Sequence, residues 1–172
     1  ESFEPWWKTL PEDPYAAAVF WLEKAAANGL RELPYISDEL VQQLANDRDA
    51  LLSIAESARL MNRFPTAFSH TDLETSKPRG WVGGWKGSRS HRLANSLFRL
   101  AAPELQADPD FIKQMVSLGT SLSKIPESQR TDEVCVAAIA GDAWQIENVC
   151  PDHPLYPEWA TQAVRDQPRA FV

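Results

Sequence analysis

The strongest constraint on the fold is a spacing of apolar residues that occurs three times, in residues 108–126, 131–149 and 156–172. Each segment opens with a residue typical of a helix start, continues with an acidic residue, and then places a large apolar residue, here called the anchor. A pair of apolar or small residues follows four and five positions later, and further apolar residues follow a polar break. The anchors are Phe111, Val134 and Trp159, the pairs are Met115-Val116, Ala138-Ile139 and Ala163-Val164, and the later residues are Leu122, Ile125, Ile146, Val149 and Phe171.

This spacing is that of a helical hairpin. In a helix, residues four apart lie on one face, so each anchor and its pair form an apolar stripe on a helix of about three turns. A single hairpin cannot bury that stripe, whereas stacked neighbours can. Residues 37–54 fit the same template loosely. The sequence therefore predicts an all-α, irregular helical-repeat (solenoid-like) domain of short helical hairpins.

The first third of the chain also carries helix signals. Asp13, followed by proline, is typical of a helix start, and Gly29 stands where a helix end takes a left-handed residue. Ser37 and the two acids after it predict a second start. The polar residues 47–49 predict a break within the apolar pattern that follows. We therefore expect N-terminal helices over 13–64.

The centre of the chain has a different composition. Residues 65–88 are rich in glycine and proline and show no lasting periodicity, which predicts a long loop. Leucines spaced three and four apart then predict a helix over 89–107, ahead of the short repeats at 108–172. No alternation typical of strands is present. The length suits one domain, 1–172.

Charge is segregated along the chain. The formal net charge is −7, yet residues 77–102 contain six lysines and arginines and no acid. Both flanks are acidic. A nucleic-acid-binding protein normally presents a basic face, so this balance argues against that class.

Three other features of the sequence bear on membrane association, on the redox compartment and on processing of the chain. The longest apolar run, 16–22, is far shorter than the ~20 residues that cross a bilayer, which predicts no membrane association. Two cysteines do not form a disulfide framework, and a reducing compartment is the simpler expectation. The sequence begins with Glu1 rather than methionine, from which we expect a fragment or a processed form.

One segment resembles a known family. Residues 125–151 read IPESQRTDEVCVAAIAGDAWQIENVCP. This resembles a bacterial family of short tandem helical repeats of unassigned function, whose units read roughly V-P-E-x-x-R-T-x-E-x-C-x-x-A-V. Cys150 replaces the usual proline, although Pro151 follows it. The resemblance implies a bacterial protein, in the cytoplasm or, as a secreted effector, in a host cell, and it brings no catalytic residue.

The segment 77–92 is the candidate binding site. It combines two tryptophans, several glycines and five lysines and arginines, a mixture suited to acidic protein surfaces. Its predicted binding residues are Arg79, Trp81, Trp85, Lys86, Arg89, His91 and Arg92. The competing structural interpretation is that the tryptophans pack into a helix groove and the cations pair with the acidic flanks. We predict a protein–protein interaction module with a protein partner.

Two other functions stay open for this segment. The first is an enzyme or ligand-binding domain, with a pocket lined by His70, Asp72, Arg79, Arg89 and His91. The second is binding of nucleic acid or phosphate, because bases stack on aromatic rings interleaved with cations.

Catalytic and metal motifs are weak throughout. Cys150 and His153 form one close C-x-x-H pair, with Cys135 upstream, but zinc usually takes four ligands as two close pairs. His70 and Asp72 offer a base and an acid without a nucleophile in a recognisable context. The glycine-rich segment lacks the lysine of a phosphate-binding loop. We therefore predict no catalytic residues, no metal and no cofactor, and favour a protein that is not an enzyme.

Overall fold

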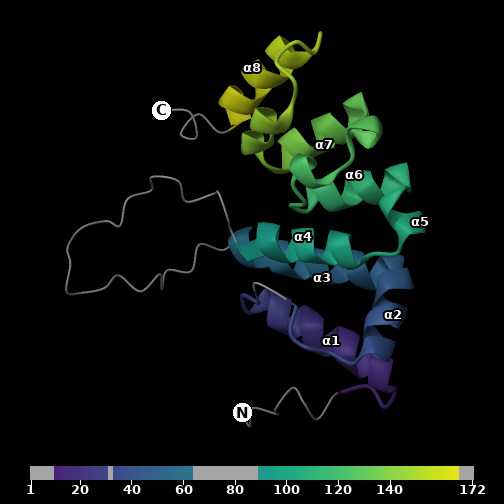
Figure 1. The fold of residues 1–172 in the computed structure, drawn as a ribbon. Coiled ribbons are helices and arrows are strands. Elements are labelled where there is room, and N and C mark those ends of the chain that lie inside the picture. Colours follow the sequence, from purple (N-terminus) through teal and green to yellow (C-terminus); the bar gives the residue numbers. More distant parts are fainter. Residues whose placement is uncertain (1–9, 31–32, 64–88, 167–172) are drawn as a thin grey trace, which may run out of the picture.

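The computed structural model describes residues 10–30, 33–63 and 89–166, with backbone alone for 60–63 and 89–91. All regular structure in these ranges is helical, so the all-α class is confirmed (Figure 1). The α-helices are α1 (Pro14–Ala27), α2 (Asp38–Asn46), α3 (Arg48–Arg63), α4 (Arg89–Leu100), α5 (Pro103–Gln106), α6 (Pro109–Ser117), α7 (Asp132–Gly141) and α8 (Tyr156–Asp166), and the 3-10 segments are η2 (Leu122–Lys124), η3 (Glu127–Gln129) and η4 (Ala143–Asn148). None of the described helices has the length and apolar character needed to span a membrane. The loop predicted over 65–88 lies outside the described residues.

The boundaries of the first helices follow their capping residues. The carboxylate of Asp13 accepts a hydrogen bond from the Ala16 amide at 2.7 Å and starts α1. Gly29 ends that helix with φ 95°, a left-handed conformation that glycine adopts without steric cost. Ser37 starts α2 by accepting from the Leu40 amide. These predicted starts and the predicted end are confirmed.

The predicted break at residues 47–49 is also confirmed. Asp47 leaves helical geometry, with φ −100° and ψ 91°, and separates α2 from α3. Its Oδ1 accepts from the Ala50 amide at 3.0 Å, so the residue that ends α2 also caps α3. Because α3 then runs on to Arg63, the segment 37–54 lacks the short second helix that the template expects.

The helix predicted over 89–107 is two helices. Pro103 has no amide hydrogen and stands at the first position of α5, where that hydrogen is not needed. Ala102 before it is extended, with ψ 149°, because the ring of a following proline disfavours the helical conformation. The Gln106 side chain donates to the Ala101 and Phe98 carbonyls and satisfies the end of α4.

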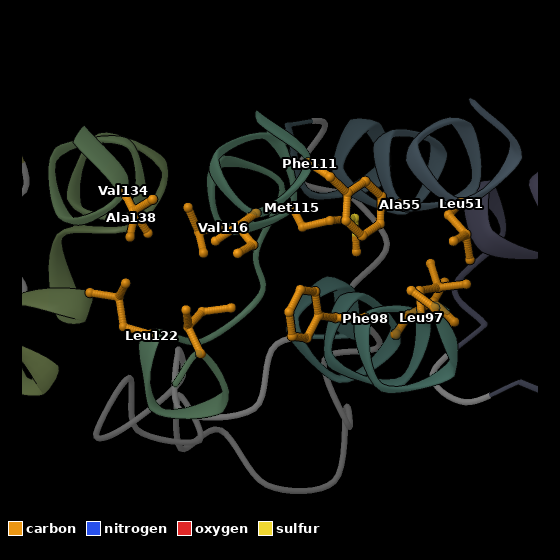
Figure 2. Packing of buried hydrophobic residues seen from close by; sticks show 14 of the residues in the cluster. Leu51, Ala55, Leu97, Phe98, Phe111, Met115, Val116, Leu122, Val134 and Ala138 are labelled. Carbon is orange, nitrogen blue, oxygen red and sulfur yellow. The ribbon is translucent and has the colours of Figure 1, made fainter. Parts of the chain in front are cut away.

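The helices pack in two layers. Figure 2 shows α3, α6 and α7 side by side in one layer, with α4 and the η2 segment facing them in the other. Further along the stack, η4 contacts η2 and α8. Arg48 of α3 pairs with Asp108 at the start of α6 at 3.0 Å, and the guanidinium of Arg59 donates to the Ser117 carbonyl. The layers are thus fixed by apolar packing and by two arginines.

The recurring apolar spacing lies in the core. All three anchors are buried, and so are both members of the first two pairs and Ala163 of the third. Leu122, Ile125, Ile146 and Val149 are buried too, in or next to the short 3-10 segments η2 and η4. Val164 differs, because it is 46% exposed. Phe171 lies outside the described residues.

We expect Gly141→Ala to destabilise the fold. A β-carbon at Gly141 would lie 2.7 Å from the Ser117 carbonyl oxygen, which is backbone and cannot move alone. Alanine normally improves a helix by about 1 kcal/mol over glycine, whereas overpacking costs typically 1–3 kcal/mol. The net loss should appear as a lower urea midpoint for Gly141→Ala. Ala140→Ser, at the exposed neighbouring position, is the control and should change little. A stabilised Gly141→Ala would show that α6 and α7 do not approach so closely.

Candidate functional site

The predicted binding segment is described only at its end. Arg79, Trp81, Trp85 and Lys86 lie outside the described residues, as do His70 and Asp72 of the enzyme alternative. For Arg89 and His91 only the backbone is described, and it forms part of the first turn of α4. Arg92 is therefore the one predicted binding residue whose side chain is described, and it is exposed.

Helix α4 has one buried and one polar face. Leu93 and Leu97 are completely buried, as is Ala94 between them. Arg92 and Arg99 are seven residues apart, which places them on the same side of the helix, and both are exposed. Ser96 lies between them and donates to the Arg92 carbonyl at 3.0 Å. Arg99 is not among the predicted binding residues, and the absence of acids from residues 77–102 is the signal in the sequence that points to it.

The position of α4 is fixed by hydrogen bonds to the chain before η2. Thr120 is buried, and its hydroxyl donates to the Ala94 carbonyl at 3.2 Å. The Ser121 amide donates to the Asn95 side chain at 2.9 Å. Hydrogen bonds to buried partners hold an element in a single orientation. The arginine face of α4 is thus presented from a fixed framework.

A polar groove that the sequence did not indicate lies between α1, α2 and α3. It is an open groove with a volume of about 580 Å³, lined by Asp13, Tyr15, Gln43, Asn46, Asp47, Arg48 and Asp49. Asp47 accepts from the Tyr15 hydroxyl at 2.8 Å while it caps α3. Asp13 caps α1, and Arg48 donates to Asp108 and Gln114. Asp13, Asp47 and Arg48 are thus already engaged in helix capping and contacts between helices.

The cysteine and histidine residues also have structural roles. The His153 ring stacks on Trp159 with centroids 4.7 Å apart. Its Nδ1 accepts from the Leu155 amide at 3.1 Å, so the ring proton of neutral His153 is on Nε2, which donates to Asp132 at 3.0 Å. Both ring nitrogens are engaged, and His153 joins the start of α7 to α8. Among the described residues, no cluster of three His, Cys, Asp or Glu side chains could hold a metal ion.

Comparison with known proteins found no match: neither a family model, nor a curated protein, nor a solved structure.

The two cysteines should differ in reactivity. Cys135 is buried in α7, and burial, together with the carboxylate of Asp132, raises the pKa of its thiol. Cys150 is exposed in a turn. Because only the thiolate reacts, a maleimide at pH 8 should modify Cys150 at least about 100-fold faster than Cys135. Peptide mass spectrometry over time measures both rates. Equal rates in the native protein, with the unfolded chain as reference, would contradict the packing of α7.

The Tyr15–Asp47 hydrogen bond should make stability depend on pH in the alkaline range. Burial, then the hydrogen bond to Asp47 and its charge, raise the pKa of Tyr15 above its ordinary value of 10.0. The folded state therefore holds this proton more tightly than the unfolded chain, and the contribution is fully present below about pH 10 and is lost above it. The free energy of unfolding of the wild type should fall more steeply above pH 10 than that of Tyr15→Phe. Tyr35→Phe, at a 94% exposed position, should follow the wild type. Parallel curves for all three proteins would refute this role of Tyr15.

Proposed function

We propose that this chain is a helical-repeat domain that binds an acidic surface of a protein partner through α4 and the segment 77–92. The observation that supports it best is the pair Arg92 and Arg99, both exposed on one side of a helix whose other side is buried. Among the described residues neither arginine makes an ion pair. Arginine is enriched among the residues that dominate protein interfaces, because its planar group pairs with carboxylates at two points.

The repeat part of the proposal is supported by matched burial. The anchor and the residue four positions later are buried in α6, α7 and α8 alike. In the first two cases a short 3-10 segment follows and contributes further buried residues. Each helix has only nine to eleven residues, a length that is marginal in isolation. Stacking on neighbours explains how such short helices persist.

An acidic protein fits the charge pattern better than nucleic acid does. The whole chain has a formal net charge of −7, so its overall field repels a polyanion. A local basic face can still recognise a discrete acidic patch, since charges beyond roughly 10 Å are screened at 0.1 M salt. The resemblance of residues 125–151 to bacterial tandem repeats supports a bacterial source. The domain would then act in the bacterial cytoplasm or, as part of a secreted effector, in a host cell.

The test is a charge reversal on α4. The double variant Arg92→Glu with Arg99→Glu should keep the fold, because both side chains are exposed, and should lose partners. Interface arginines each contribute about 1–2 kcal/mol, so two reversals should lower partner recovery at least about tenfold. Recovery is measured by quantitative mass spectrometry after nuclease-treated affinity purification from the source cells.

The control is a double variant with the same change in charge elsewhere. Lys124→Glu with Arg165→Glu alters two exposed cations on η2 and α8, and Arg165, like Arg99, lies in the last turn of its helix. This variant should recover partners as the wild type does. Equal loss in both variants, or no partner with the wild type, would reject the proposal. Recovery that depends on nucleic acid and falls steeply with salt would favour the nucleic-acid alternative.

A further inference from the structure

Helix α1 is apolar on nearly every side, although only one side of it is packed. Its 14 residues include one acid, Glu23, and one base, Lys24. The side that includes Leu22 and Ala26 is buried against the core. Figure 1 shows α3 and α2 next to α1 at the N-terminal end of the molecule. Because a helix that is apolar all round is normally buried, the outward side of α1 calls for an explanation.

The outward side carries four residues in the spacing of a seam between two packed helices. These residues, here called the α1 seam, are Asp13, Ala17, Phe20 and Lys24, at intervals of four, three and four. Because a helix makes one turn in 3.6 residues, this spacing places them in one line, opposite the buried side. Asp13 and Lys24 are exposed, and Ala17 and Phe20 are half-buried. Trp21, beside the line, is 39% exposed and adds apolar surface.

The order of these residues makes the α1 seam complementary to itself. In an antiparallel pair of α1 helices centred between residues 18 and 19, position 13 faces position 24 of the other copy, and position 17 faces position 20. Asp13 then meets Lys24, and Ala17 leaves room for the ring of Phe20. Each contact occurs twice by the symmetry of the pair. A parallel pair would instead place like charges opposite each other, which is unfavourable.

Both charges of the α1 seam are available for such contacts. Neither Asp13 nor Lys24 takes part in an ion pair with another described residue. One oxygen of the Asp13 carboxylate caps the Ala16 amide, which leaves the other oxygen as an acceptor. The Lys24 Nζ lies 5.2 Å from the centre of the Phe20 ring, so the ammonium is held on the seam side. Glu23, by contrast, accepts from a hydroxyl of α3 and belongs to the packed side.

We infer that α1 is a dimerisation surface, which binds α1 of a second copy of this chain in antiparallel orientation. A second copy is the occupant because one seam supplies both the acid and the base, and both the small and the large residue. The interface is small, since a 14-residue helix is about 21 Å long and a standard interface buries about 800 Å² on each partner. The dimer is therefore weak, with a dissociation constant of about 0.1 mM.

The test is sedimentation velocity of the full chain from about 10 µM to about 1 mM, at about 0.15 M salt. The wild type should pass from monomer to dimer across this range. Lys24→Glu sets carboxylates against each other at both symmetric contacts and should weaken association about tenfold. Lys124→Glu, the same change at an exposed lysine of η2, is the control and should associate as the wild type does. At about 1 M salt, which screens exposed charges, Lys24→Glu should associate within about twofold of the wild type.

A mixture of two variants tests the antiparallel order. Asp13→Lys and Lys24→Glu each place like charges together when they pair with themselves, and opposite charges when they pair with each other. An equimolar mixture should therefore associate about tenfold more tightly than either variant alone. Asp13→Lys also removes the cap on the Ala16 amide. Phe20→Ala keeps that cap and is a second test, which should weaken association about tenfold at either salt concentration.

Four results would overturn the inference. The first is a wild type that stays monomeric up to about 1 mM, as it would if another segment of the chain covered α1. The second is association that Lys24→Glu and Phe20→Ala leave unchanged. The third is a mixture no tighter than its components, while circular dichroism shows that Asp13→Lys keeps its helix content. The fourth is association lost in the Arg92→Glu with Arg99→Glu variant instead, which would place the contact on α4.

This inference is independent of the proposal for α4. Both α1 and α4 pack on α3, and no residue of α4 belongs to the α1 seam. The α1 variants leave Arg92 and Arg99 unaltered, so a monomeric wild type that still recovers its protein partner through α4 would reject the dimer alone.

Discussion

The structure depends on the packing of short helices against neighbours on two adjoining faces. An isolated helix of nine or ten residues is marginal in water, because the few hydrogen bonds that it forms do not offset the unfavourable free energy of nucleation. In α6, Phe111 and Met115 lie on one face and Ile112 and Val116 on the next, and all four are buried. Such a helix is stable only between neighbours. The two layers and the close contact at Gly141 provide these neighbours, and the capping residues stabilise the helix starts.

Local signals made much of the helical structure predictable. Asp13, Ser37 and Asp47 each accept a hydrogen bond from the amide three residues later, so sequence spacing is enough to find them. The prediction of one helix over 89–107 was wrong because leucine spacing alone does not show where a helix ends, whereas Pro103 marks the start of α5. The loose match of residues 37–54 to the repeat template fails for a different reason. Contacts with neighbouring helices can extend a helix beyond what its local sequence predicts, and α3 contacts α1, α2, α4 and α6.

The candidate site shows where sequence reasoning ends. Arg92 could be named because a run of cations without acids is visible in the sequence, and its exposure follows from the leucines beside it. The groove between α1, α2 and α3 could not be found, because Tyr15 and Asp47 are 32 residues apart and no local pattern joins them. The same holds for His153, whose partner Asp132 is 21 residues away. Its proximity to Cys150 suggested metal binding, whereas its contacts are with α7 and α8.

The buried residues of the framework are separate from the arginines through which we propose that the chain binds a partner. On α4, the leucines that join it to the stack and the arginines that face solvent lie on opposite sides of a twelve-residue helix. A substitution at Arg92 or Arg99 therefore changes the charge of the surface without opening a cavity.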